Sequence, residues 1–86
     1  GHNEFMILYH SKTLVATDPV YLNHIKQSLS GLKKLPYEYE ILYPQGQQIS
    51  SDKHTAYAVI ILKTNTTLSS KELENFTAAI KQPKSM

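Results

Sequence analysis

Hydrophobic and polar residues alternate strictly along one short stretch near the middle of the chain. Residues 37–43 read YEYEILY. A period of two is typical of a β-strand whose two faces meet different surroundings. Burying Glu38 and Glu40 without partners would cost more free energy than burying tyrosines. The tyrosine row is therefore expected to face the core, and it comprises Tyr37, Tyr39, Ile41 and Tyr43. The outward row comprises Glu38, Glu40 and Leu42.

Two other stretches have the patterns of buried strands. Residues 5–9, FMILY, form an apolar run too short for a helix, which predicts a strand buried on both faces. Residues 55–63, TAYAVIILK, are rich in β-branched side chains and predict a central strand, with 37–43 at an edge. The polar stretch at 44–54 contains Pro44 and Gly46 and predicts a long loop.

The first helix is expected after Asp18. Asp18 can cap the helix, Pro19 suits its first position, and Gly31 can end it. Its predicted buried stripe recurs at helical spacing and comprises Leu22, Ile25, Leu29 and Leu32.

A second helix is expected to begin at Ser69. Ser69 and Glu72 have the spacing of a capping box, and Leu68 can pack against Leu73. Pro83 is expected to stop this helix. Its predicted buried stripe comprises Leu73, Phe76 and Ile80.

The order of these elements predicts an α+β fold. We expect a β-α-β-β-α two-layer sandwich that is ferredoxin-like without the fourth strand, and a single domain over residues 6–82. An alternative is ββαββα, with a hairpin around Ser11 and Lys12. Residues 1–5 resemble the remnant of a tag or cloning site, and residues 83–86 are expected to fray.

Composition narrows the classes of protein and of site. The chain has 86 residues, 41% hydrophobic and 19% charged, with a net charge of +2 and no cysteine. These values are typical of a small globular domain, and they exclude disulfides, thiolate metal sites and cysteine nucleophiles. No apolar run approaches the roughly 20 residues of a membrane span. We expect a cytoplasmic protein without a cofactor and without membrane contact.

Without a fourth strand, the first strand is expected to form an open edge of the sheet, and one face of the sheet is expected to have no helices over it. An unpaired strand edge invites another chain, and a contiguous apolar face favours a partner. The open face is expected to hold Leu42 with either the row Tyr57, Val59 and Ile61 or the row of even residues from Ala56 to Leu62. We therefore predict a non-enzymatic protein interaction domain that forms a dimer or docks a protein partner. The candidate interaction residues are Met6, Leu8, Tyr9, Leu42, Tyr57, Val59 and Ile61.

A small RNA- or single-stranded-DNA-binding domain is the alternative function. The element order is that of the RNA-recognition motif, and Tyr57 matches one of its stacking positions. The motif's other positions hold Thr55, Ala56, Val59 and Leu62 instead of its basic, glycine and aromatic residues. The glutamates of the open face would repel phosphates, which makes this function less favoured. The basic residues available to it are the scattered Lys12, Lys33, Lys34, Lys53 and Lys63.

Three polar residues are expected to approach one another at the end of the sheet. Antiparallel pairing of the first and third strands brings His10 near His54, and Asp52 lies close by in sequence. Two imidazoles and a carboxylate can bind a metal or perform acid-base chemistry. Histidines at strand ends are more often solvated, and the chain contains no recognisable catalytic motif. We therefore expect neither an enzyme nor a metal site.

Overall fold

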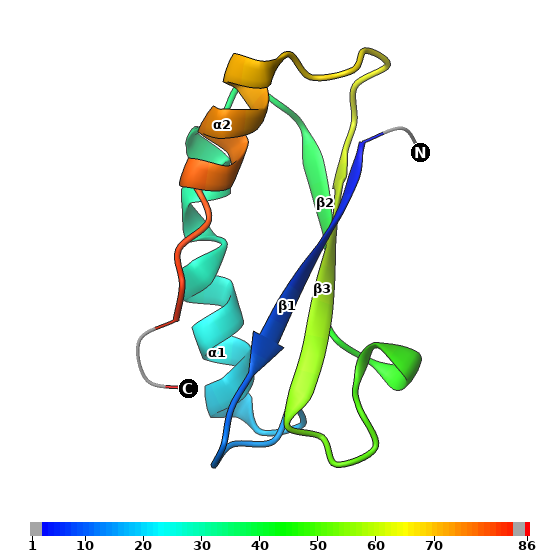
Figure 1. Ribbon diagram of the computed structural model, residues 1–86, viewed down its shortest axis with the longest axis vertical. Coiled ribbons are helices and arrows are strands. Elements are labelled where there is room, and N and C mark those ends of the chain that lie inside the picture. The colour runs from blue at the N-terminus through cyan, green and yellow to red at the C-terminus, as the bar shows by residue number, and fades with distance from the viewer. Residues whose placement is uncertain (1–2, 84–85) are drawn as a thin grey trace.

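The chain folds into two layers, a sheet and a layer of helices on one side of it (Figure 1). The computed structural model describes residues 3–83 and 86. Strands β1 (Glu4–His10), β2 (Tyr39–Leu42) and β3 (Thr55–Leu62) form one sheet in the order β1-β3-β2, with β3 antiparallel to both neighbours. Helices α1 (Pro19–Ser28) and α2 (Ser70–Ala78) form the other layer, and two short 3-10 turns, η1 (Ser30–Lys34) and η2 (Gly46–Gln48), follow α1 and β2 respectively. The prediction of a small α+β fold is confirmed.

Strand β3 occupies the centre of the sheet, as predicted. Its even residues are buried under the helices, and its odd residues are partly exposed on the opposite face. Ala58 and Ile60 are completely buried. The row on the open face is therefore Tyr57, Val59 and Ile61.

Strand β2 confirms the orientation predicted for the alternating stretch, although the strand is shorter than the stretch. The tyrosine row is half-buried and packs against the core, while Glu38, Glu40 and Leu42 are exposed. The Tyr37 hydroxyl donates a hydrogen bond of 2.9 Å to Glu72 Oε2 and so joins the start of this stretch to α2.

The prediction that β1 is buried on both faces is wrong. Phe5, Ile7 and Tyr9 point toward the helices, whereas Met6 and Leu8 are 64% and 67% exposed. The reason is that β1 forms an edge of the sheet and that helices cover only one of its faces. Residues 3–5, expected to be a cloning remnant, take part in the fold, since Glu4 and Phe5 begin β1 and Asn3 is buried.

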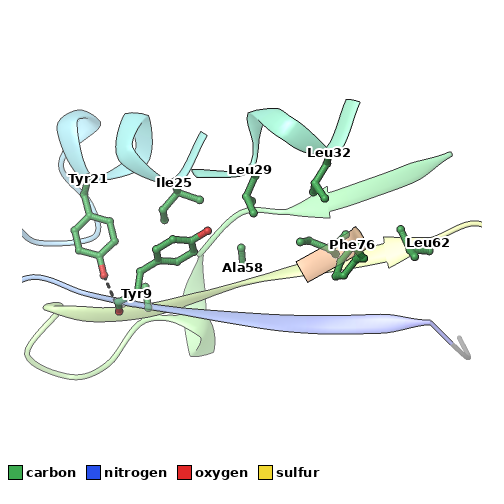
Figure 2. Close-up of a cluster of buried hydrophobic side chains, with 10 residues drawn as sticks. Tyr9, Tyr21, Ile25, Leu29, Leu32, Ala58, Leu62 and Phe76 are labelled. Carbon is green, nitrogen blue, oxygen red and sulfur yellow. Dashed lines mark hydrogen bonds between the residues drawn. The ribbon is translucent and has the colours of Figure 1, made fainter. Parts of the chain in front are cut away.

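Helix α1 begins as predicted, and three of the four residues of its predicted stripe, Ile25, Leu29 and Leu32, are buried. Asp18 Oδ1 accepts a hydrogen bond of 2.8 Å from Val20 N, and Pro19 occupies the first turn. The helix ends at Ser28 instead of at Gly31, where the chain has tightened into η1. Tyr21 is completely buried, and Leu22 only partly. Tyr21 takes the place predicted for Leu22, because its hydroxyl donates to Tyr9 O in β1 (Figure 2) and to His54 O in the loop before β3.

Helix α2 confirms the capping box at Ser69 and Glu72. The hydrogen bond from Ser69 N, followed by the one from the Tyr37 hydroxyl, lowers the pKa of the Glu72 carboxyl. Only Phe76 is buried in this helix, and Leu73 is 42% exposed. The helix ends at Ala78, well before Pro83, so Pro83 does not terminate it.

The alternative ββαββα order is wrong for the residues that the structure describes. The segment after β1 contains no strand, because it turns around the buried Ser11. Ser11 Oγ accepts hydrogen bonds from Leu14 N at 2.8 Å and Thr13 N at 3.2 Å. Ala16 N donates to Lys53 O at 2.7 Å and fastens the segment to the loop before β3.

Gly31 is required by the close approach of η1 to the end of α2. A Cβ at this position would lie 2.5 Å from the carbonyl oxygen of Ala79. We expect Gly31→Ala to lower the free energy of unfolding by about 1–3 kcal/mol, because backbone atoms must move. Urea unfolding measures this loss. Lys33→Ala, at an exposed position of the same turn, is the control, and an equal midpoint for the two variants would contradict the steric explanation.

Candidate interaction surface

The open face of the sheet carries an apolar band. Antiparallel pairing places Met6 beside Val59, and Val59 beside Leu42, while Leu8 lies beside Tyr57. Ile61 lies two residues beyond Val59 on the same face of β3 and lengthens this row of side chains. Such cross-strand neighbours are close enough for their side chains to touch. We call this set the apolar band: Met6, Leu8, Leu42, Tyr57, Val59 and Ile61.

Polar residues border the apolar band at both ends. At one end Glu4 and Glu40 flank Ile61, and the Glu40 carboxylate lies 3.5 Å from Lys63 Nζ. At the other end His10 pairs with Thr55, and its Nδ1 lies 2.8 Å from the Thr55 hydroxyl. An apolar centre with polar margins is the composition of many protein interfaces.

Tyr9 differs from the other candidate interaction residues because its side chain lies on the helix side. It is 4% exposed, and its hydroxyl lies 2.9 Å from Ser28 Oγ. Burial raises the pKa of this phenol. Figure 2 shows Tyr9 among the buried side chains beneath α1. Tyr9 therefore packs between β1 and the helices and is not part of the apolar band.

β1 is the outer strand of the sheet, and hydrogen bonds at its two ends show which backbone groups line its outer edge. Asn3 O accepts from Leu62 N at 2.9 Å, and Ser11 N donates to His54 O at 2.9 Å. In an antiparallel pair, the residues that bond to the partner alternate with residues whose groups point away. The odd residues of β1 therefore bond to β3. The N–H and C=O groups that point away from the sheet belong to Glu4, Met6, Leu8 and His10.

The opposite edge of the sheet, β2, is less accessible to another strand. β2 has only four residues, and Pro44 follows shortly after it. Gln48 Nε2 donates to Leu42 O at 3.2 Å and to Tyr57 O at 3.0 Å, so the loop is tied to the end of the β2–β3 junction. Short strands and prolines are common protections of a sheet edge. β1 has seven residues in unbroken register and contains neither proline nor lysine.

A groove runs between β1 and the segment that follows α2. Its volume is about 590 Å³. Ser28 holds this segment in place, since Ser28 Oγ donates to Lys81 O at 2.5 Å and Ser28 O accepts from Lys81 N at 2.9 Å. Pro83 and Met86 of the expected frayed tail line the groove, while residues 84 and 85 of that tail lie outside the described residues. The β1 residues that line it are Ile7, Leu8, Tyr9 and His10.

The side chains of the predicted polar cluster bond to other partners and not to one another, although His54 and His10 lie close enough to Asp52 to act on its carboxyl electrostatically. His54 Nδ1 donates to Leu14 O at 2.9 Å, because a carbonyl oxygen can only accept, and His10 is directed to Thr55. The Asp52 carboxylate accepts from Ser50 Oγ at 2.7 Å and from His54 N at 3.0 Å, and these bonds lower its pKa. Among residues 3–83 and 86, no group of three or more acidic, histidine or cysteine side chains could hold a metal ion.

Comparison with protein families, curated proteins and solved structures finds no match to this chain. No helix within the described part of the chain is long and apolar enough to cross a membrane. The apolar band and the β1 edge are therefore the features from which a function can be argued.

Proposed function

We propose that this chain is a non-enzymatic protein interaction domain that associates with a second copy of itself through β1. The observation that carries the proposal is the exposure of Met6 and Leu8, at 64% and 67%, on a strand whose outer edge has no partner strand within residues 3–83 and 86. Large apolar side chains in one contiguous patch are costly to leave in water, and association through β1 shields part of this surface.

The arrangement of the sheet supports this use of β1. We propose that the fold is ferredoxin-like without its fourth strand, on the basis of the strand order β1-β3-β2 and of two helices on one face. In that arrangement a fourth strand lies beside the first. β1 therefore offers a place that is shaped to receive a strand from another molecule, as in recognition by β-strand addition.

RNA or single-stranded-DNA binding, the alternative function, receives less support from the residues around the open face. Tyr57 is the single aromatic residue of the apolar band, which leaves only one platform for stacking a base. Glu4 and Glu40 border the same face, and Lys63 is engaged with Glu40. A nucleic-acid surface requires a concentration of positive charge that this face lacks.

The test is the solution mass of the chain, measured by sedimentation from micromolar to near-millimolar concentration. We expect a monomer at the dilute end and a dimer at the concentrated end. A monomer throughout would contradict self-association. If that monomer then bound a single-stranded oligonucleotide with a strong salt dependence, the nucleic-acid alternative would replace the proposal.

A further inference from the structure

The sequence of β1 is nearly symmetric about its central residue. The strand reads EFMILYH, with Ile7 at the centre. Outward from Ile7, Met6 matches Leu8 as an aliphatic pair, and Phe5 matches Tyr9 as an aromatic pair. The ends combine an acidic residue, Glu4, with His10, a residue that can carry positive charge. An antiparallel copy of this strand would therefore place each residue opposite one of matching or complementary chemistry.

We propose that two copies of the chain join β1 to β1 in antiparallel orientation, with Ile7 of each copy on a two-fold axis. This inference rests on the proposed self-association and specifies its geometry. In this register Met6 lies opposite Leu8 of the copy, and Glu4 lies opposite His10 of the copy. The sheet then continues from one molecule into the other, with both apolar bands on the same face and both helix layers on the other.

The hydrogen-bonding pattern of β1 selects this type of register. The outward N–H and C=O groups belong to Glu4, Met6, Leu8 and His10, as the bonds at Asn3 and Ser11 establish. The second copy presents the same even residues at its own edge. In an antiparallel pair its even residues must therefore lie opposite the even residues of the first copy. Registers centred on Met6 or on Leu8 also satisfy this condition, but they leave part of the strand unpaired. Only the register centred on Ile7 pairs the whole strand.

The surroundings of the edge leave room for a second strand. On the helix side, the groove of about 590 Å³ lies along Ile7 to His10, where the first half of the copy's strand would be placed. On the open side, Met6 and Leu8 would each gain an aliphatic neighbour from the copy. Stacking of two open faces would also cover the apolar band, but it would leave the outward backbone groups of β1 without strand partners.

Disulfide cross-linking tests the register, because the natural chain contains no cysteine. In the proposed dimer Ile7 faces its own copy at a non-hydrogen-bonded position, where Cα atoms are about 4.5 Å apart. That separation lies within the range of about 4.4–6.8 Å that a disulfide spans. We expect Ile7→Cys to form a covalent dimer on mild oxidation. Thr13→Cys, in an exposed loop, is the control for random collision.

Ile7 packs against the core, so Ile7→Cys could destabilise the fold. A second pair of variants tests the register without changing a core residue. Met6→Cys and Leu8→Cys are both at exposed positions of β1. In the proposed register Met6 lies opposite Leu8 of the copy and not opposite Met6. A mixture of the two variants should therefore yield several-fold more disulfide-linked dimer than either variant alone. Equal yields in the mixture and in the separate variants would overturn the register.

Val59→Cys distinguishes a dimer joined edge to edge through β1 from a dimer in which the two open faces stack. Val59 lies at the centre of the open face, far from a β1–β1 junction but central to two stacked faces. Sedimentation under reducing conditions is measured in parallel. A dimer that cross-links through Val59→Cys and not through the β1 variants would overturn edge pairing and preserve self-association. A monomer in sedimentation with no cross-linking above the Thr13→Cys control would overturn both.

Discussion

Replacing Met6 and Leu8 together with lysine will convert the dimer into a monomer at concentrations where the natural chain associates. Both side chains are exposed in the single copy and would be shielded by a neighbouring copy. Shielding a side chain of this size completely is worth about 1.5–3 kcal/mol. Two-fold symmetry also brings the added charges of the copies close together. We expect the dissociation constant to rise by roughly 100-fold or more, as a loss of about 3 kcal/mol implies.

Matched substitutions separate this effect from the general effect of adding lysine. Val20 and Leu73 are 50% and 42% exposed and lie on α1 and α2, away from the open face. The double variant Val20→Lys with Leu73→Lys adds the same charge and should dimerise like the natural chain. Sedimentation over the same concentration series compares the three proteins. Equal dissociation constants for the two double variants would exclude β1 as the association surface.

Folding should be preserved in the Met6 and Leu8 variant. The two side chains contribute little to the core of a single copy, and surface substitutions of this kind usually change stability by within about 0.5 kcal/mol. Chemical unfolding of the monomer at low concentration checks this. A loss of dimer with unchanged monomer stability would locate the effect at the interface.

Features with a local cause could be predicted from the sequence. Asp18 caps α1, and Ser69 with Glu72 caps α2, because these contacts depend only on residues within one turn. The period of two in residues 37–43 also predicted which side chains face the core, since charge on one row excludes that row from burial. The high apolarity of residues 55–63 correctly placed β3 in the centre of the sheet.

Features with a distant cause were not visible in the sequence. Leu22 was expected to be buried, yet Tyr21 takes that place because its hydroxyl reaches Tyr9 O at 3.1 Å and His54 O at 3.1 Å. Ser28 resembles a solvated helix residue, but it is buried and bonds to the segment after α2. No pattern within α1 indicates that these distant carbonyl groups lie next to it.

The candidate surface was likewise predictable from the sequence only in part. Leu42 was predicted to share the open face with one of two rows of the third strand, and the structure shows that this row is Tyr57, Val59 and Ile61. The exposure of Met6 and Leu8 was compatible with the expected edge but conflicted with a strand buried on both faces. The direction of the β1 backbone groups required the register with β3, which is set by tertiary pairing. Gln48, which bonds to both strands where β2 ends, gave no sequence signal beyond a polar loop.

The largest loss of stability is expected from Phe76→Ala. Phe76 is the one buried side chain of α2, and its ring lies 4.3 Å from the ring of Phe5, centroid to centroid. Removing a buried phenylalanine costs about 3–5 kcal/mol through lost burial and the cavity that remains. The total stability of such a domain is about 5–15 kcal/mol. We therefore expect a large shift of the urea unfolding midpoint, with some of the chain unfolded without denaturant if the total is at the low end.

Leu73→Ala is the matched control because Leu73 belongs to the same helix and was predicted to share its buried stripe. Its 42% exposure implies a much smaller loss than that of Phe76→Ala. Phe76→Leu should recover part of the loss, since it restores apolar volume without the ring. If Phe76→Ala and Leu73→Ala had equal midpoints, the contact between Phe5 and Phe76 could not be what holds α2 on the sheet. The helix would then depend on the bonds between Ser28 and Lys81, which join the end of α1 to the segment that follows α2.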